Sequence, residues 1–393
     1  AGGSAVIARK MGAGKEKEAS QDFTLIVLSG VVLGIMIVIL GRVFLDEIIK
    51  GLGASEQLFG YCREYLGILL IFTPASMLQV LFQNLIITAG RPRVGMVLSI
   101  GAGAMNVLLD YIFMASLEMG ISGSALGTGI GYCIPAVIGI CFFLRGNFRI
   151  GNSQQGSFPL GHSKEEMGNM RFKRPVFRPA VLMESCTNGC SELVSQVAAS
   201  VTTFLFNAVM IRLLGENGVA AITIIIYTQF LLTSLYIGFS MGVAPIISYH
   251  YGSQNYPELK TVFHICLRFI GIVSILIFVL SMAAGSWLVN IFSPEGTEVY
   301  EIAREGFLIF PFGFLFCGWN IFSSSAFTAL SNGILSAVIS FLRTFCFLTL
   351  FLILLPEVIG VMGVWLAVPI AECVTMLMAI SLLVSNREKY HYL

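Results

Sequence analysis

Long apolar runs separated by short polar segments dominate the chain. A membrane-spanning helix needs about 20 predominantly apolar residues, and ten runs of roughly that length or more occur here. They lie near 23–44, 65–89, 94–116, 121–144, 180–213, 218–248, 264–292, 306–330, 333–355 and 359–385. A shorter apolar piece at 1–8 has the pattern of the end of a further helix. The pattern predicts an all-α polytopic membrane protein.

The longest polar stretch, 146–178, separates two groups of these runs. It is rich in Gly, Ser, Lys and Arg, a composition typical of a linker. We therefore predict an N-lobe over 1–145, a cytoplasmic linker over 146–178 and a C-lobe over 179–393.

The two lobes resemble each other at a constant offset of 240 residues. GGSAVIARKMGAGKEKEA (2–19) aligns with GVAPIISYHYGSQNYPEL (242–259), and the same offset places Thr88 on Thr328. Since the second lobe begins about 60 residues before its aligned segment, a complete first lobe needs about 60 more residues ahead of Ala1. We expect two parallel, pseudo-symmetric six-helix lobes around a central cleft, with the first helix and most of the second missing here.

Composition agrees with a membrane protein. Hydrophobic residues make up 56% of the chain and charged residues 11%, whereas a soluble globular chain carries about 25% charged residues. The net charge of +1 gives no indication of a nucleic-acid partner. The nine Cys lie mostly in apolar runs without a CxxC pair, so we interpret them as small buried residues rather than disulfides or metal ligands.

The distribution of positive charge predicts the orientation. If the first polar connection, 9–22, is cytoplasmic, then 17 of the 23 Lys and Arg residues fall on that side. Five fall outside, and Arg343 lies within a span. The positive-inside rule therefore predicts a cytoplasmic linker and a cytoplasmic C-terminus.

Two polar residues interrupt the apolar run MNVLLDYIFM (105–114). Asn106 and Asp110 stand four residues apart, so a helix places them on one face. A carboxylate at the centre of a membrane helix costs about 2.5–3.5 kcal/mol on insertion scales, which favours a functional role. The alternative is geometric: Asp110 lies about 25 Å along the helix from Arg93, where it could simply meet water.

The second lobe has its own ionisable residues inside predicted spans. Glu184, Asn188 and Glu192 recur every four residues and form one polar stripe. We expect the stripe to face a cavity, unless the first turns of that helix lie in cytoplasmic water. Glu372 is our candidate for the second carboxylate of a carboxylate pair in the C-lobe. The alternative is a plain ion pair between Arg343 and Glu372 that joins neighbouring helices.

Several segments, in order along nearly the whole chain, resemble the multidrug and toxic compound extrusion (MATE) family. They are N-x-x-x-D at 106–110, GISGSALGTGIGY (120–132), NGCSELV (188–194), FLFN (204–207), GFSMGVAPIISYHYG (238–252) and GVWLAVPIAE (363–372). The resemblance implies two six-helix lobes and cation-driven export by alternating access. The sequence also departs from the family pattern, because the first helix, which usually contributes a carboxylate to the ion site, is absent from it.

The resemblance also implies a site for the coupling ion. In this family an Asn and an Asp on the fifth helix share a site with a Thr on the sixth, and Asn106, Asp110 and Thr128 match that pattern. A carboxylate, an amide oxygen and a hydroxyl are hard donors suited to Na⁺, and a desolvated carboxylate can equally carry H⁺. A family acid on the seventh helix matches Glu192.

We predict that the substrate or coupling region of the C-lobe comprises Asn188, Glu192, Asn207, Arg343 and Glu372. Asn207 alone could instead make an interhelical hydrogen bond.

Together these observations predict a secondary active exporter and not an enzyme. It would expel amphiphilic or cationic organic compounds by Na⁺- or H⁺-coupled antiport, with no cofactor besides the coupling ion. We expect a monomer in the bilayer of a bacterial plasma membrane.

Two alternatives remain open. A flippase for lipid-linked intermediates shares the superfamily architecture but would need a cluster of basic residues in its cavity to hold diphosphate. An intramembrane lipid transferase would need a motif such as DDxxD or HExxH, and the sequence contains neither.

Overall fold

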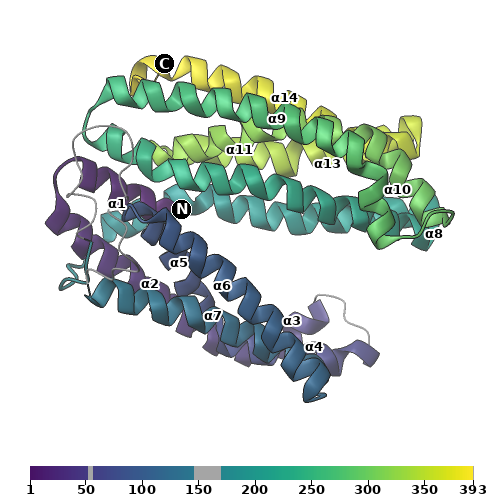
Figure 1. Ribbon diagram of the computed structural model, residues 1–393, viewed down its shortest axis with the longest axis horizontal. Coiled ribbons are helices and arrows are strands. Elements are labelled where there is room, and N and C mark those ends of the chain that lie inside the picture. Colours follow the sequence, from purple (N-terminus) through teal and green to yellow (C-terminus); the bar gives the residue numbers. More distant parts are fainter. Residues whose placement is uncertain (52–55, 146–169, 393) are drawn as a thin grey trace. The chain divides into compact units, whose positions relative to one another are not determined.

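Helices form every regular element in the described part of the chain, residues 1–51, 56–145 and 170–392 of the computed structural model. Figure 1 shows these helices along the chain. Backbone polar groups in a bilayer have no water to bond, so they must be satisfied within each helix. The predicted all-α membrane fold is confirmed.

Contacts divide the chain into two compact units. One comprises Gly14–Leu182, and the other comprises Ala1–Ala13 together with Met183–Leu393. The division into lobes at 1–145 and 179–393 stays a prediction. Residues 146–169 of the predicted linker lie outside the described residues.

The described residues of the unit Gly14–Leu182 form six α-helices and one π-helical turn. They are α2 (Glu16–Val43), α3 (Leu45–Gly51), α4 (Glu56–Ile71), α5 (Thr73–Thr88), α6 (Pro92–Asp110), η1 (Tyr111–Ser116) and α7 (Gly120–Arg145).

The other unit contains the remaining elements. They are α1 (Gly2–Gly12), α8 (Pro179–Gly252), α9 (Tyr256–Phe292), α10 (Glu298–Ile309), η3 (Phe310–Gly313), α11 (Phe314–Ala329), α12 (Gly333–Phe341), η4 (Leu342–Phe347), α13 (Leu348–Ile359), α14 (Val361–Ser385) and α15 (Arg387–Tyr390).

The lengths of the helices agree with the ten predicted crossings. Eight helices in the described ranges are long and apolar enough to span a membrane, or nine if α4 and α5 form one bent span. One of them, α8, has 74 residues, which would be about 110 Å if straight. Its backbone leaves the helical region at Gly215 (φ 63°, ψ −152°), so α8 holds both spans predicted over 180–213 and 218–248.

Two predicted elements differ from the structure. The span predicted over 65–89 is divided between α4 and α5, which bend by 54° at their junction. Pro74, in the first turn of α5, lacks the N–H that would continue the helix from α4. The helix end predicted at 1–8 continues to Gly12.

The backbone supports the internal repeat. Gly14 and Gln254 both have positive φ, 72° and 56°, and they differ by the same 240 residues as the aligned sequences. Gly120 and Gly360, with φ of 59° and 61°, stand in the same relation. Residues with positive φ thus stand at corresponding connections between helices in the two halves.

Corresponding glycines also meet where the ends of α1 and α8 cross. A Cβ atom on Gly12 would collide with the carbonyl oxygen of Tyr249, and one on Gly252 would collide with that of Arg9. Arg9 aligns with Tyr249 and Gly12 with Gly252, so the contact is reciprocal. Only residues without a side chain allow two backbones this close.

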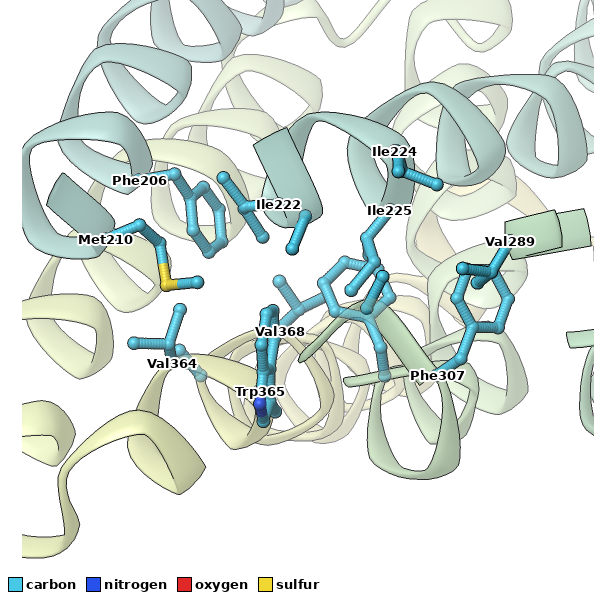
Figure 2. Packing of buried hydrophobic residues seen from close by; sticks show 14 of the residues in the cluster. Phe206, Met210, Ile222, Ile224, Ile225, Val289, Phe307, Val364, Trp365 and Val368 are labelled. Atoms are coloured by element: carbon cyan, nitrogen blue, oxygen red, sulfur yellow. The ribbon is translucent and has the colours of Figure 1, made fainter. Parts of the chain in front are cut away.

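The apolar core of the larger unit fills the space between α8, α9, α10 and α14 (Figure 2). Trp365 and Val368 of α14 pack against Phe206 and Ile225, which lie on either side of the break in α8. Because one cluster contains residues from both sides of Gly215, the two spans of α8 are packed neighbours.

We expect Gly252→Ala to lower the thermal stability of the purified protein, because the added methyl group meets backbone that cannot rotate away. Overpacking of this kind costs about 1–3 kcal/mol. Gly242→Ala is the matched control, since nothing lies within 4 Å of a Cβ at Gly242 in the same helix. Equal melting temperatures for the two variants in a thermal-shift assay would contradict the close crossing.

Candidate functional site

A row of glycines on α7 allows α6 and η1 to pack unusually close to α7. Gly123, Gly127 and Gly131 recur every four residues and therefore lie on one face. A Cβ on Gly123 would lie 3.0 Å from Phe113, and one on Gly131 would lie 3.4 Å from Cβ of Asn106. A Cβ on Gly127 would collide with Oδ1 of Asp110. The small-xxx-small spacing thus sets the distance between the two helices.

The close approach brings the three predicted residues of the first lobe together. Nδ2 of Asn106 on α6 donates a hydrogen bond of 3.3 Å to Oγ1 of Thr128 on α7. Asp110 lies one turn further along α6, against Gly127 beside Thr128. The three side chains therefore provide one carboxylate, one amide and one hydroxyl on a single helix interface.

Asp110 has a buried oxygen that makes no hydrogen bond. Its Oδ1 is inaccessible and has no hydrogen-bond partner, and no ion pair involving Asp110 occurs within the described ranges. A buried polar atom without a partner costs about 1–3 kcal/mol, and more if it is charged. An ion or a proton that binds there would remove that cost.

The donor set fits a small monovalent ion better than a transition metal. It contains one acidic residue, and the described residues contain no group of three or more His, Cys, Asp or Glu with metal-binding geometry. Oxygen donors with low total charge are typical of hard cations. Asn106 uses its N–H₂ group for Thr128, so its Oδ1 is available as a ligand.

A π-helical turn begins immediately after Asp110. The span predicted over 94–116 is α-helical only to Asp110, and Tyr111–Ser116 forms η1. A π-helical turn contains one more residue than an α-helical turn and often occurs at functional sites. No residue in YIFMAS predicts this change from sequence.

In the second lobe, Arg343 and Glu372 form an ion pair. Nε of Arg343 donates to Oε1 and Oε2 of Glu372 at 2.9 and 3.0 Å, and Nη2 lies 2.8 Å from Oε1. The side chains are only 17% and 8% exposed. The structure therefore contains the interhelical ion pair that the sequence left as an alternative, between η4 and α14.

Asn320 completes this group, and sequence analysis did not include it. Its Nδ2 donates to Oε2 of Glu372 at 2.7 Å and to the backbone oxygen of Glu372 at 2.9 Å. Both carboxylate oxygens of Glu372 thus accept hydrogen bonds. A polar residue within the apolar helix 314–329 was the available signal.

The other predicted C-lobe residues do not join this group. Oδ1 of Asn188 accepts a 3.0 Å hydrogen bond from the N–H of Gly333, the first residue of α12. Glu192 is exposed and contacts Gln196 at 3.5 Å, whereas Asn207 has a buried Oδ1 without a partner. The roles predicted for these three residues remain predictions.

The remaining acid of the predicted stripe, Glu184, pairs with Arg9 of α1 at 2.7 Å. The stripe therefore makes three different kinds of contact along one face of α8. They are an ion pair, a hydrogen bond to a backbone N–H and a contact with a neighbouring side chain.

Comparison with known proteins identifies the family. The model of the MatE family matches residues 1–112 and 193–354, which is more than half of the chain. The multidrug export protein MepA of Staphylococcus haemolyticus is 25% identical over 323 residues, which cover 81% of this chain and 67% of that protein. MepA of Staphylococcus aureus (strain MRSA252) is 23% identical over the same shares.

Solved structures share the fold. A mutant of the Vibrio cholerae MATE transporter VcmN superposes with a TM-score of 0.86 at 19% identity, covering 100% of this chain and 84% of that one. An outward-facing multidrug resistance MATE family transporter of the MOP superfamily gives 0.87 at 19% identity, with 99% and 82% covered. A MOP superfamily transporter from Pyrococcus furiosus gives 0.87 at 18% identity, with 98% and 83% covered.

At these identities the structures establish the fold alone, and the family model establishes membership. This chain belongs to the MatE family and is a multi-pass membrane transporter, not an enzyme.

Proposed function

We propose that this transporter exports amphiphilic or cationic organic compounds and is driven by Na⁺ or H⁺ that binds at Asp110. The relatives named as multidrug export proteins support the export of drugs. The buried, unpartnered Oδ1 of Asp110 supports the ion site and is the observation that carries the proposal.

The ion site can drive transport because its occupancy changes the charge inside the protein. When empty, it leaves a carboxylate oxygen buried without a partner, which destabilises that conformation of the lobe. When occupied by Na⁺ or H⁺, the carboxylate is neutralised, so the ion favours whichever conformation buries the site most completely. Alternating exposure to the two sides of the membrane would then couple ion entry to export.

The available energy is sufficient for drug efflux. One elementary charge that crosses 100 mV is worth about 2.3 kcal/mol. At about 1.4 kcal/mol per factor of ten, one ion exchanged for a neutral substrate sustains a substrate gradient of roughly 50-fold. For a monovalent cationic substrate the two charges cancel, and the concentration gradient of the ion drives export. A bacterial plasma membrane supplies such a potential, and we propose that location with the C-terminus in the cytoplasm.

The flippase alternative receives no support from the second lobe. Arg343 lies within a span, but its charge is neutralised by Glu372. A diphosphate group would have to compete with a bidentate carboxylate for this guanidinium.

We expect Asp110→Asn to abolish ion-driven efflux while the protein remains folded, because the amide keeps the shape but cannot bind a cation by charge. Ethidium efflux from cells that express each variant, with membrane expression measured in parallel, is the assay. Glu118→Gln, at an exposed turn of the same helical hairpin, is the control and should transport normally. Undiminished efflux by Asp110→Asn at equal expression would contradict the proposal.

The coupling ion can be determined with Thr128→Ala. If Na⁺ binds, loss of a hydroxyl ligand should raise the Na⁺ concentration for half-maximal efflux at constant pH by about tenfold, the equivalent of one hydrogen bond of about 1.5 kcal/mol. If H⁺ binds, the same variant should instead shift the pH dependence and leave the Na⁺ dependence absent. If neither the Na⁺ dependence nor the pH dependence of efflux changes, Thr128 is not part of the site.

We also propose that Arg343 and Glu372 join η4 and α14 and do not bind substrate. Removal of one partner leaves a buried charge and costs about 3–5 kcal/mol, so Glu372→Gln should lower the melting temperature strongly. The double variant Arg343→Met/Glu372→Gln should recover most of the stability and retain efflux. A stable double variant without efflux would show instead that the pair acts in transport.

A further inference from the structure

The residues before α8 form a strap without regular secondary structure, Met170–Arg178, that lies against the start of α2. Phe172 anchors it, with its ring 4.9 Å from that of Phe23 and 6.4 Å from that of Phe143. Phe23 and Phe143 are themselves buried. The strap belongs to the same compact unit as α2, Gly14–Leu182.

Polar contacts fix the strap at two points, in its middle and at its end. The backbone N–H of Lys173 donates to Oγ1 of Thr24 at 3.1 Å. Arg178 donates to Asp22 at 3.2 Å and to Gln21 at 3.2 Å. Because Lys173 lies at Thr24 and Arg178 lies nearer the start of α2, the strap runs antiparallel to the helix with a defined backbone position.

The fixed backbone presents three positive charges that have no ion-pair partner among the described residues. The side chains of Arg171, Lys173 and Arg174 are exposed, and in the described part of the chain none of them forms an ion pair or side-chain hydrogen bond. Lys17 of α2 is also exposed and lies on the face that holds Gln21 and Thr24, by helical spacing.

Apolar side chains lie directly beside these charges. Phe177 is 76% exposed and Val176 is 42% exposed, although Met170 of the same strap is buried and Phe172 is half-buried. An exposed Phe next to several basic residues is typical of a segment that lies at the boundary between lipid headgroups and acyl chains.

The position of the strap along α2 agrees with a location near the lipid headgroups. Leu28, 47% exposed, begins the run of lipid-facing apolar residues on α2 that continues through Val32, which is 64% exposed. Thr24 precedes Leu28 by one turn, about 6 Å along the axis. The strap is therefore about one turn outside the apolar surface, where phosphate groups of the bilayer lie.

We propose that Arg171, Lys173 and Arg174 bind the headgroup phosphates of anionic phospholipids, with Phe177 and Val176 in the adjacent interfacial region. Basic clusters next to a membrane span attract anionic lipid, and here the strap holds them at a fixed depth. An acidic protein partner or a soluble phosphate would explain the charges but not the exposed Phe177 in the same strap.

The experiment compares lipids and variants on the purified full chain. Protein in neutral detergent is titrated with phosphatidylglycerol or phosphatidylcholine, and bound lipid is counted by native mass spectrometry. The triple variant Arg171→Gln/Lys173→Gln/Arg174→Gln should weaken phosphatidylglycerol binding at least about tenfold, given roughly fivefold for each basic residue. Phosphatidylcholine binding should stay unchanged.

A control with the same loss of charge distinguishes a site from general attraction. Lys260, Arg268 and Arg387 are exposed in the other unit and fall on the same predicted side of the membrane. The variant Lys260→Gln/Arg268→Gln/Arg387→Gln should keep phosphatidylglycerol binding near wild type. Arg171→Lys/Arg174→Lys, which preserves the charge, should also keep it, so this variant separates the loss of charge from a change of side-chain shape.

The proposal fails on any of three results. The strap variant could bind phosphatidylglycerol as wild type does, or the control triple variant could lose binding to the same extent. Glycerol phosphate, added at the same concentration, could displace the lipid fully, which would identify a soluble phosphate as the ligand.

Discussion

The distance between α6 and α7 is the constraint on which the candidate ion site depends. Helices in lipid gain little from hydrophobic association, since acyl chains are as apolar as Leu, so backbone packing decides which helices approach closely. Gly123, Gly127 and Gly131 remove the side chains that would keep α6 away. As a result Asp110 lies against backbone instead of lipid, and Asn106 comes within hydrogen-bonding distance of Thr128. A larger residue at Gly127 would occupy the space of the carboxylate oxygen.

The two halves place a buried carboxylate on corresponding helix pairs but treat its charge differently. In the first, α6 and α7 hold Asp110 with one oxygen unpartnered. In the second, the corresponding pair, α12 to α13 with α14, holds Glu372 against Arg343 and Asn320. A satisfied carboxylate has little to gain from an incoming cation, whereas an unsatisfied one has much. The pseudo-symmetric fold thus contains one carboxylate with an unsatisfied oxygen among the described residues and one whose two oxygens both accept hydrogen bonds.

Corresponding positions also explain why α1 groups with the second half. Its end crosses the end of α8 through Gly12 and Gly252, and Arg9 pairs with Glu184 at the start of α8. By the repeat, α1 corresponds to the end of α8 itself, so two equivalent helix ends pack on each other. Contacts with its counterpart, rather than position in the chain, place α1 in that unit.

Apolar length and residue spacing act locally along a helix, so they were enough to predict the membrane class, nearly all the spans and the repeat. The association of Thr128 with Asn106 and Asp110 was implied only by the resemblance to the MATE family. The sequence predicted less well where a helix bends or changes type, at Pro74 and at η1, because those depend on how neighbouring helices replace lost backbone hydrogen bonds. Only tertiary structure decided that Glu372 is paired and Asp110 is not, since both are single acids in apolar runs. What separates them is what a neighbouring helix brings beside the carboxylate: the guanidinium of Arg343 at 2.9 Å in one case, and Gly127, which has no side chain, in the other.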